Sequence, residues 1–320
     1  MSERFYTLLL HLSLAVILTG AIVSHFGRQE GRVRLDPGIT TSQWVMEDGT
    51  VKELPELMTL QDFQIELYPD SKEHKDYKSV ITAGLGEDAY PLVISMNKIG
   101  RIKGYRFYQS GYDGASTILM VVRDPWGVGI TYAGYILFLT GFIGLLLKRK
   151  YDRRIRLTLL IAFLLACVSV LIMFWPGSHM IPVLRSPLLP VHVLPILMSY
   201  LLFGYVAFNG ILGLARKDSS GKLMDFSLQL LFPSVFLIAF GTIIGSVWAN
   251  ISWGSYWSWD PKETWALVTT LVYAAALHGK HIKVFRNTRF FHIYSIAAFV
   301  CVLISFLGVS LLMGGMHSYL

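Results

Sequence analysis

The sequence predicts an all-α polytopic membrane protein with about seven transmembrane helices and a small β-rich extracytoplasmic domain. The chain is 53% hydrophobic and only 15% charged, whereas a soluble domain carries about 25% charged residues. The apolar residues form runs of the length that a helix needs to cross a bilayer. Lys and Arg gather between these runs, so we interpret the formal net charge of +7 as a topology signal and expect no nucleic acid partner.

Seven apolar runs are candidate spans. They cover residues 5–26, 127–147, 156–175, 191–214, 226–249, 264–280 and 291–313. The first run could be a cleaved signal peptide, but only Arg4 precedes it and it lacks a small-residue cleavage site. We therefore expect it to be kept as a membrane anchor.

Basic clusters set the expected orientation. They lie at 148–156, 216–222 and 280–289, after the second, fourth and sixth runs. Because cytoplasmic loops carry an excess of Lys and Arg, these three loops are expected inside. This predicts a multi-pass protein of the bacterial inner membrane, with its N-terminus inside and both the 250–263 loop and the C-terminal tail outside.

The segment 28–124 is the one long polar stretch, and it predicts the β-rich domain. Short runs of β-branched and aromatic residues alternate in it with turn signals such as Asp36-Pro37-Gly38. The expected strands are Arg32–Leu35, Phe63–Leu67, Ser79–Thr82, Leu92–Met96, Arg106–Gln109 and Thr117–Val122.

Four of the nine histidines are candidate ligands of haem iron, for which histidine is a common axial ligand. His11 lies in the first run and His278 ends the sixth, both toward the inside. His192 opens the fourth run and His317 follows the seventh, both toward the outside. Each one alone could equally be an interfacial or helix-packing histidine, the interpretation that we give to His292.

A dense aromatic segment joins the fifth and sixth runs. Trp253, Trp257, Trp259 and Trp265 fall within thirteen residues, interleaved with glycine and charge. The plain alternative is an interfacial aromatic belt, but flat rings also suit a flat macrocycle. We expect Asp260 to cap the following helix, with proline at its first position.

These residues resemble a known family. Trp253–Trp265 is similar to the WWD signature, WGxxWxWDPKE, of the haem-handling membrane proteins of cytochrome c biogenesis. The CcsA branch, the system II cytochrome c synthase, is resembled by Val191-His192 with Met198-Ser-Tyr200, by Leu277-His278 and by Gly315-Met-His317-Ser-Tyr319. The ResB or CcsB partner is resembled by Leu10-His11-Leu-Ser13, Met96-Asn97, Gly104–Asp113 and Arg123-Asp-Pro125.

The resemblance implies a CcsB–CcsA fusion, with residues 1–147 as the ResB-like part and 148–320 as the CcsA-like part. It implies export of haem b as a transported substrate and its covalent attachment to the CxxCH of apocytochrome c. Partners would be the apocytochrome, thiol reductants of the maturation pathway and, as an open alternative, an additional membrane subunit that supplies further spans.

The resemblance also implies roles for single residues. His11 and His278 would be the intramembrane ligands of haem iron, and His192 and His317 the outer ligands. Trp253, Trp257, Trp259, Trp265 and Asp260 would form the outer haem surface, and the outer ligands, Asp260 and the first three tryptophans would also serve attachment.

Two other functions stay open from the residues alone. One is a haem carrier or exporter that delivers haem to another protein without ligase activity. The other is a non-haem transporter whose outer gate is lined by aromatic rings. Haem absorbance separates the second from the rest, and cytochrome maturation separates the first.

Overall fold

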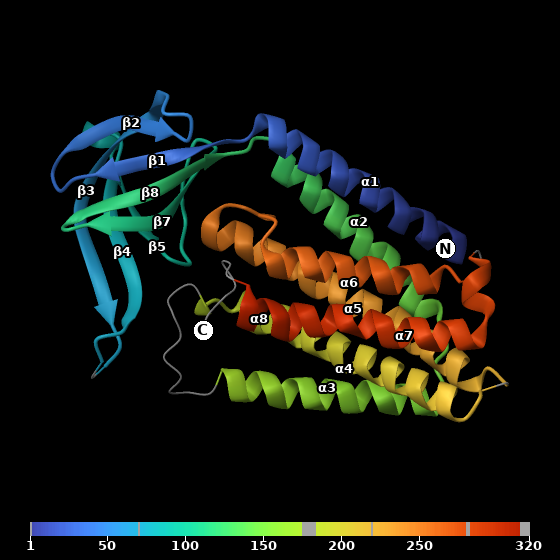
Figure 1. Ribbon diagram of the computed structural model, residues 1–320. Coiled ribbons are helices and arrows are strands. Elements are labelled where there is room, and N and C mark those ends of the chain that lie inside the picture. The colour runs from blue at the N-terminus through green and yellow to red at the C-terminus, as the bar shows by residue number, and fades with distance from the viewer. Residues whose placement is uncertain (1, 70, 175–183, 219, 280–281, 314–320) are drawn as a thin grey trace. The chain divides into compact units, whose positions relative to one another are not determined.

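The computed structural model describes the chain except residues 1, 70, 175–183, 219, 280–281 and 314–320. The chain forms two compact units (Figure 1), which we describe separately. The sheet unit comprises Met1–Phe142, Gly177–Leu189 and Ser246–Tyr256. The helical unit comprises Ile143–Pro176, Pro190–Gly245 and Trp257–Leu320.

The sheet unit is built on one antiparallel sheet of eight strands, in the order β5-β4-β3-β2-β1-β8-β7-β6. The strands are β1 (Gln29–Leu35), β2 (Thr40–Met46), β3 (Val51–Leu67), β4 (His74–Ala83), β5 (Tyr90–Ser95), β6 (Gly100–Ile102), β7 (Tyr105–Asp113) and β8 (Ser116–Arg123). β1 pairs with β8 along its whole length, so the first strand and the last lie together at the centre of the sheet.

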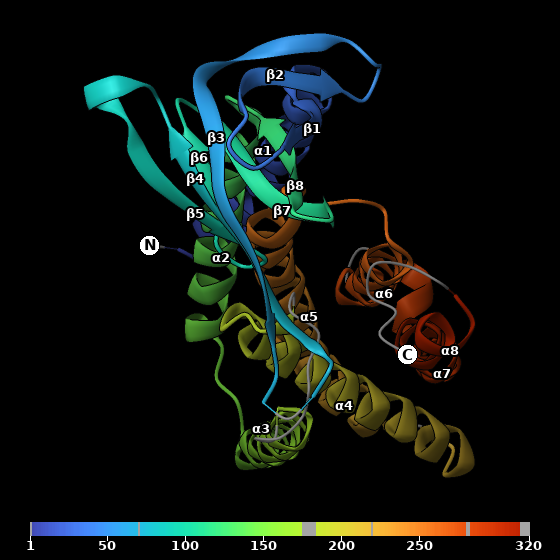
Figure 2. The same cartoon turned by 90° about the vertical axis from the view of Figure 1, so that its left-hand side faces the viewer.

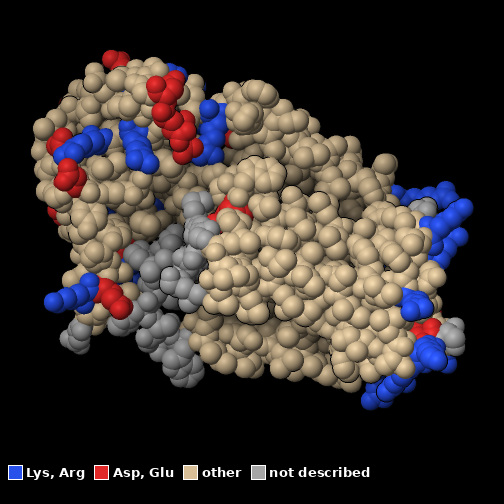
Figure 3. Space-filling view, in the orientation of Figure 1, with Lys and Arg blue, Asp and Glu red and all other residues tan. Residues whose placement is uncertain are grey.

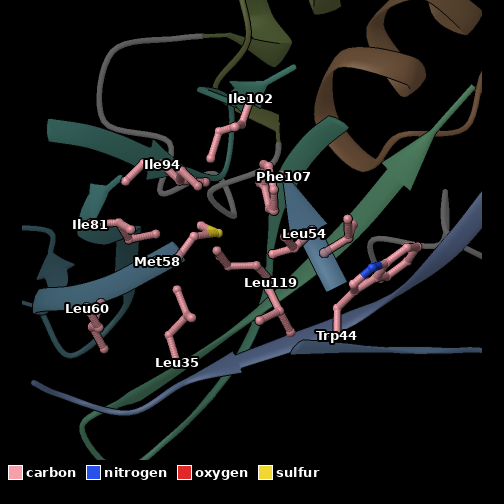
Figure 4. Close-up of a cluster of buried hydrophobic side chains, with 13 residues drawn as sticks. Leu35, Trp44, Leu54, Met58, Leu60, Ile81, Ile94, Ile102, Phe107 and Leu119 are labelled. Carbon is pink, nitrogen blue, oxygen red and sulfur yellow. The ribbon is translucent and has the colours of Figure 1, made fainter. Parts of the chain in front are cut away.

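The sheet curls until its two edge strands face each other. A Cβ added to Gly100 of β6 would lie 2.7 Å from the Ile94 side chain of β5. Inside the curl, the Ser79 hydroxyl of β4 lies 2.8 Å from both Gln109 Oε1 and Thr117 Oγ1. Thirteen buried apolar side chains fill the rest of this core, with Met58 and Phe107 near its middle (Figure 4). Because edge strands with unpaired backbone groups attract other chains, curling protects this sheet.

Two long helices flank the sheet in sequence and pack antiparallel, α1 (Glu3–Gly27) and α2 (Gly127–Lys148). Small residues let their backbones approach closely. A Cβ added to Gly134 would lie 2.6 Å from Ile17, and one added to Gly127 would lie 2.5 Å from Ser24. Asp124 joins the ends of the pair, because it accepts from Ser24 Oγ at 2.5 Å and from the Gly127 amide at 2.8 Å.

The helical unit contains α3 (Arg153–Met173), α4 (Leu188–Ala215), α5 (Lys222–Trp253), α6 (Pro261–Leu277), α7 (Thr288–Leu303) and the short α8 (Val309–Leu312). α4 and α5 extend beyond it by a few residues at one end. Phe203 of α4 stacks on Tyr273 of α6, with ring centroids 3.8 Å apart. The Tyr294 hydroxyl of α7 donates to the Val272 carbonyl of α6 at 2.7 Å, and α6 to α8 lie together in both views (Figures 1 and 2).

The predicted fold class is wrong on two points. The β part is not a small addition to an all-α protein, because eight strands in one sheet occupy residues 29–123. Within the described residues, six helices rather than seven are long and apolar enough to span a membrane. The expected span 264–280 forms α6, whose 17 residues reach about 25 Å, less than the ~30 Å of a bilayer core.

The six expected strands are present, but two others were missed. β2 contains Thr40-Thr-Ser-Gln43, and β6 has only three residues, so neither shows a clear apolar alternation. β3 begins twelve residues before the expected Phe63, in a stretch rich in Glu and Lys. Only its inward side chains, such as Leu54, Met58 and Leu60, are apolar.

The helical unit carries its charge at one end. Figure 3 shows Lys and Arg gathered where α4 is followed by α5 and α6 by α7, while the sides of the helices are nearly uncharged. At this end Asp218, in the loop between α4 and α5, accepts a hydrogen bond from His292 Nε2 of α7 at 3.3 Å. His292 is 1% exposed, so the expectation of an interfacial or loop histidine is wrong.

We expect Asp218→Ala to lower the thermal unfolding midpoint of the purified protein. The substitution leaves His292 without its partner, and an unsatisfied buried polar group costs about 1–3 kcal/mol. Asp225→Ala, one turn into α5 and exposed, is the matched control. An unchanged midpoint for Asp218→Ala would show that the pair contributes nothing to stability.

The effect of Asp218 should depend on pH in the acid range. Burial raises the pKa of Asp218, but hydrogen bonds from His292, Ser220 and two backbone amides outweigh burial, and the pKa lies below its usual value of 3.8. A depressed carboxyl pKa contributes stability above the unfolded value that is lost as pH falls through the folded value. The difference between wild type and Asp218→Ala should therefore be full above about pH 4 and should shrink below it.

Candidate functional site

The second half of the tryptophan segment is fixed by the start of α6. Asp260 caps the helix, as expected, and accepts from the Lys262 amide at 2.9 Å. Glu263 reaches back and accepts from the amides of Asp260 at 3.3 Å and Ser258 at 2.8 Å. Pro261 is the first helical residue. The Asp-Pro-Lys-Glu part of the segment is therefore a capping box that also holds the residues before it.

Trp259 lies in this clamped stretch with an unusual backbone. Its φ is 59°, a conformation that is strained for a residue with a bulky side chain. The side chain is 68% exposed, and its ring packs edge-on against Trp257 at 5.8 Å. Strain of this kind persists only where the surroundings impose it, and it is enriched at functional sites.

The first half of the segment belongs to the sheet unit and is anchored by Asn250. The Asn250 Oδ1 accepts from Arg106 Nη1 of β7 at 3.0 Å, and its Nδ2 donates to the Tyr132 hydroxyl of α2 at 2.8 Å. Its backbone carbonyl accepts from the Tyr108 hydroxyl at 3.1 Å. Burial raises the pKa of the Tyr108 phenol, which keeps it a neutral donor. One amide side chain thus joins β7, α2 and the end of α5.

Trp253 follows this anchor directly. Its ring meets Trp248 at 5.0 Å in an edge-on arrangement. The next residue, Gly254, has φ 80°, and a Cβ there would lie 2.9 Å from the Tyr108 ring. Only glycine fits this turn against the sheet, so the sheet determines where Trp253 lies.

Sequence reasoning missed the residues that support Trp253. Arg106 and Tyr108 lie in the run that resembles ResB, but no role was assigned to them. Trp248 and Asn250 precede the WWD-like stretch by a turn of helix. A polar residue at the end of an apolar run, Asn250, was the one available signal.

His192 lies against α5 in a defined orientation. Its Nδ1 is 2.7 Å from the Gly241 carbonyl. A Cβ added to Gly245, one turn further along, would lie 2.5 Å from the imidazole ring, so both glycines are needed for the ring to lie there. Because a carbonyl can only accept, Nδ1 carries the proton and the lone pair is on Nε2, the nitrogen that a metal would use.

His11 and His278 have the same tautomer for a local reason. His11 Nδ1 is 2.7 Å from the Thr7 carbonyl, and His278 Nδ1 is 2.8 Å from the Ala274 carbonyl, each four residues earlier. Both side chains are exposed. His11 belongs to the sheet unit and His278 to the helical unit, while His317 lies outside the described residues. The structure therefore describes no pair of these histidines together.

The remaining site residues divide in the same way. Trp257, Trp259, Asp260 and Trp265 lie together at the start of α6, whereas Trp253 belongs to the sheet unit. Trp265 is in the second turn of α6 and half-buried.

A cavity of about 600 Å³ lies beside His278 in the helical unit. Leu277 and Gly279, on either side of that histidine, line it together with Phe285. Two guanidinium groups, those of Arg149 and Arg286, also line it. Such a cavity matches an apolar molecule that carries carboxylates, because arginine binds carboxylates well.

Comparison with known proteins places both parts of the chain. Residues 128–317 match the family model described as cytochrome C assembly protein, and residues 1–124 match the ResB-like family. The chain is 35% identical over 153 residues to the protein NrfI of Wolinella succinogenes, which covers 44% of the chain and 17% of NrfI.

Two further relatives carry the name cytochrome c biogenesis protein CcsA. The one from Gloeothece citriformis is 46% identical over 34% of the chain and 33% of the relative. The one from Guillardia theta is 35% identical over 45% of the chain and 57% of the relative. Each alignment thus spans less than two thirds of the relative's length. With its apolar helices and with a family model that matches more than half of it, the chain is a multi-pass membrane protein that belongs to the cytochrome c assembly protein family, and it carries a ResB-like part in the same polypeptide.

Proposed function

We propose that this protein exports haem across the membrane and presents it for covalent attachment to the CxxCH segment of apocytochrome c. The observation that carries the proposal is the clamped tryptophan segment, which holds the Trp259 indole exposed on a strained backbone. A protein gains nothing in stability from an exposed indole held this way, so the arrangement indicates a binding surface.

Uptake would occur on the side of the basic loops, which we propose is the cytoplasm. His11 and His278 would be the iron ligands there, each with its lone pair on Nε2. The cavity lined by Arg149 and Arg286 lies beside His278 and would receive the propionates while its apolar wall contacts the ring.

On the outer side, His192 and His317 would hold the iron, with Trp253, Trp257, Trp259 and Trp265 against the macrocycle. Asp260 would act through the capping box that positions Trp259. The two cysteine thiols of the apocytochrome would then add across the two vinyl groups. Each addition forms one S–C bond and moves the thiol hydrogen to the other vinyl carbon, so no oxidant is needed. The chain would contribute position and orientation.

The proposal assigns a place to each part. The ResB-like part, 1–147, would hold Trp253 through the sheet, and the CcsA-like part, 148–320, would carry three of the four histidines. The protein would lie in the bacterial inner membrane with its N-terminus inside. Thiol reductants would keep the CxxCH segment reduced, and haem b would be the transported substrate.

The outer ligands can be tested by spectroscopy and maturation together. We expect wild type to purify with a Soret band and to mature a co-expressed cytochrome c, and we expect the His192→Ala, His317→Ala double variant to lose maturation. Added imidazole should restore part of it by replacing the missing ligands. Maturation by the double variant without imidazole would exclude the outer site.

The same experiment separates the alternatives. Bound haem without any maturation by wild type, in the presence of apocytochrome and reductant, would favour a carrier that delivers haem to another protein. A wild type that carries no Soret band when haem is supplied would favour a non-haem transporter.

Gly245→Ala tests the orientation of His192. The new methyl group would occupy the place of the imidazole, so maturation should fall toward the level of His192→Ala while the protein still folds. Gly204→Ala is the matched control, since a Cβ there would have its nearest neighbour at 3.4 Å. Equal activity of the two glycine variants would show that the orientation of His192 is unimportant.

Trp259 allows stability and function to be separated. Trp259→Gly should be more stable than Trp259→Ala by about 1 kcal/mol, because only glycine adopts φ 59° without strain. Both variants should mature cytochrome poorly, since both lack the indole. Unfolding midpoints and maturation assays give the two readouts. Wild-type maturation by Trp259→Ala would remove this residue from the haem surface.

A further inference from the structure

A second cavity in the helical unit, of about 770 Å³, has no part in the proposed haem path. α3, α4 and α5 line it. Its apolar wall is formed by Leu157, Ile161 and Leu165 of α3 and by Leu201 and Leu202 of α4. Among the described residues that line it there is no histidine or cysteine, the side chains that would most readily hold haem iron.

The cavity runs from the basic end of the unit into the apolar span. Arg154, at the start of α3, and Leu165 both line it. Eleven residues of helix separate them, which corresponds to about 16 Å, or roughly half of a bilayer core. Leu157, Ile161 and Leu165 follow one another at intervals of four, so they form one face of α3. The cavity thus has the depth of a single leaflet.

Its mouth is cationic. Arg154 and Lys222 line it, and within the described residues neither side chain forms an ion pair or a hydrogen bond. Asp152 and Asp225 line it too, but each lies at a helix N-terminus, where the helix dipole already compensates a negative charge. Asp152 also accepts from the Ile155 amide at 2.8 Å.

The combination matches one class of molecule. A phosphate would be attracted by Arg154, by Lys222 and by the N-termini of α3 and α5, which both begin at this mouth. An apolar chain would follow the leucine-lined wall inward. Basic pockets between transmembrane helices are a known setting for lipid headgroups.

We propose that this cavity binds a phospholipid of the leaflet next to the basic loops, with its phosphate between Arg154 and Lys222 and an acyl chain along α3. α3 is among the least buried of the spanning helices, with 17% of its apolar window covered by protein. The lipid therefore supplies packing that the protein does not, and it holds α3 against α4 and α5.

Native mass spectrometry of the purified full-length protein in detergent tests the proposal, with titration of short-chain phosphatidylglycerol and phosphatidylethanolamine. Wild type should retain about one phospholipid. Arg154→Gln with Lys222→Gln should bind roughly tenfold more weakly, which corresponds to about 1.4 kcal/mol. Arg153→Gln, exposed and outside the cavity, is the matched control.

A second pair of variants tests the wall. Ile161→Trp should fill the cavity and lower lipid occupancy, whereas Leu160→Trp, which is exposed but does not line the cavity, should leave it unchanged. Equal lipid retention by the two variants would overturn the proposal, and so would a site that inorganic phosphate alone saturates. Loss of bound haem with unchanged lipid in Ile161→Trp would assign the cavity to haem instead. Loss of lipid with normal haem content supports the proposal whether or not the haem path is correct.

Discussion

The sheet unit depends on one buried side chain, Asn250. It is 4% exposed and uses its amide oxygen, its amide nitrogen and its backbone carbonyl to hold Arg106, Tyr132 and Tyr108. Each such bond contributes only about 1 kcal/mol net, but leaving any of these buried groups unsatisfied costs more. The three bonds therefore act together, and removing Asn250 would release a strand and a helix at once.

This cluster also joins the two family regions. Arg106 and Tyr108 lie in the part that matches the ResB-like model, and Tyr132 and Asn250 lie in the part that matches the assembly model. In relatives where the two regions are separate polypeptides, such contacts would form between chains. A single chain makes the encounter intramolecular, which replaces binding between polypeptides by a much higher effective concentration.

The sequence allowed some of these features to be predicted and not others. Asp260 was predicted as a cap because capping depends on residues that are adjacent in the chain. The eight-stranded sheet was underestimated because β2 and most of β3 expose polar side chains on one face, and only strand pairing makes them strands. Asp218 and His292 are 74 residues apart, and no local pattern links them. α6 resembled a span because its apolar composition is suited to one, although its helix ends at Leu277.

The three described candidate histidines share a tautomer but not its cause, and the difference bears on how rigid each site is. At His11 and His278 the Nδ1 partner is the carbonyl four residues earlier in the same helix, a contact that any helical histidine can make. At His192 the partner is a carbonyl of another helix, and Gly241 and Gly245 leave room for the ring. The orientation of His192 is thus specified by tertiary packing. A ligand that must give way to an incoming histidine in one defined direction needs such a fixed position, whereas a ligand that only captures haem from solution does not.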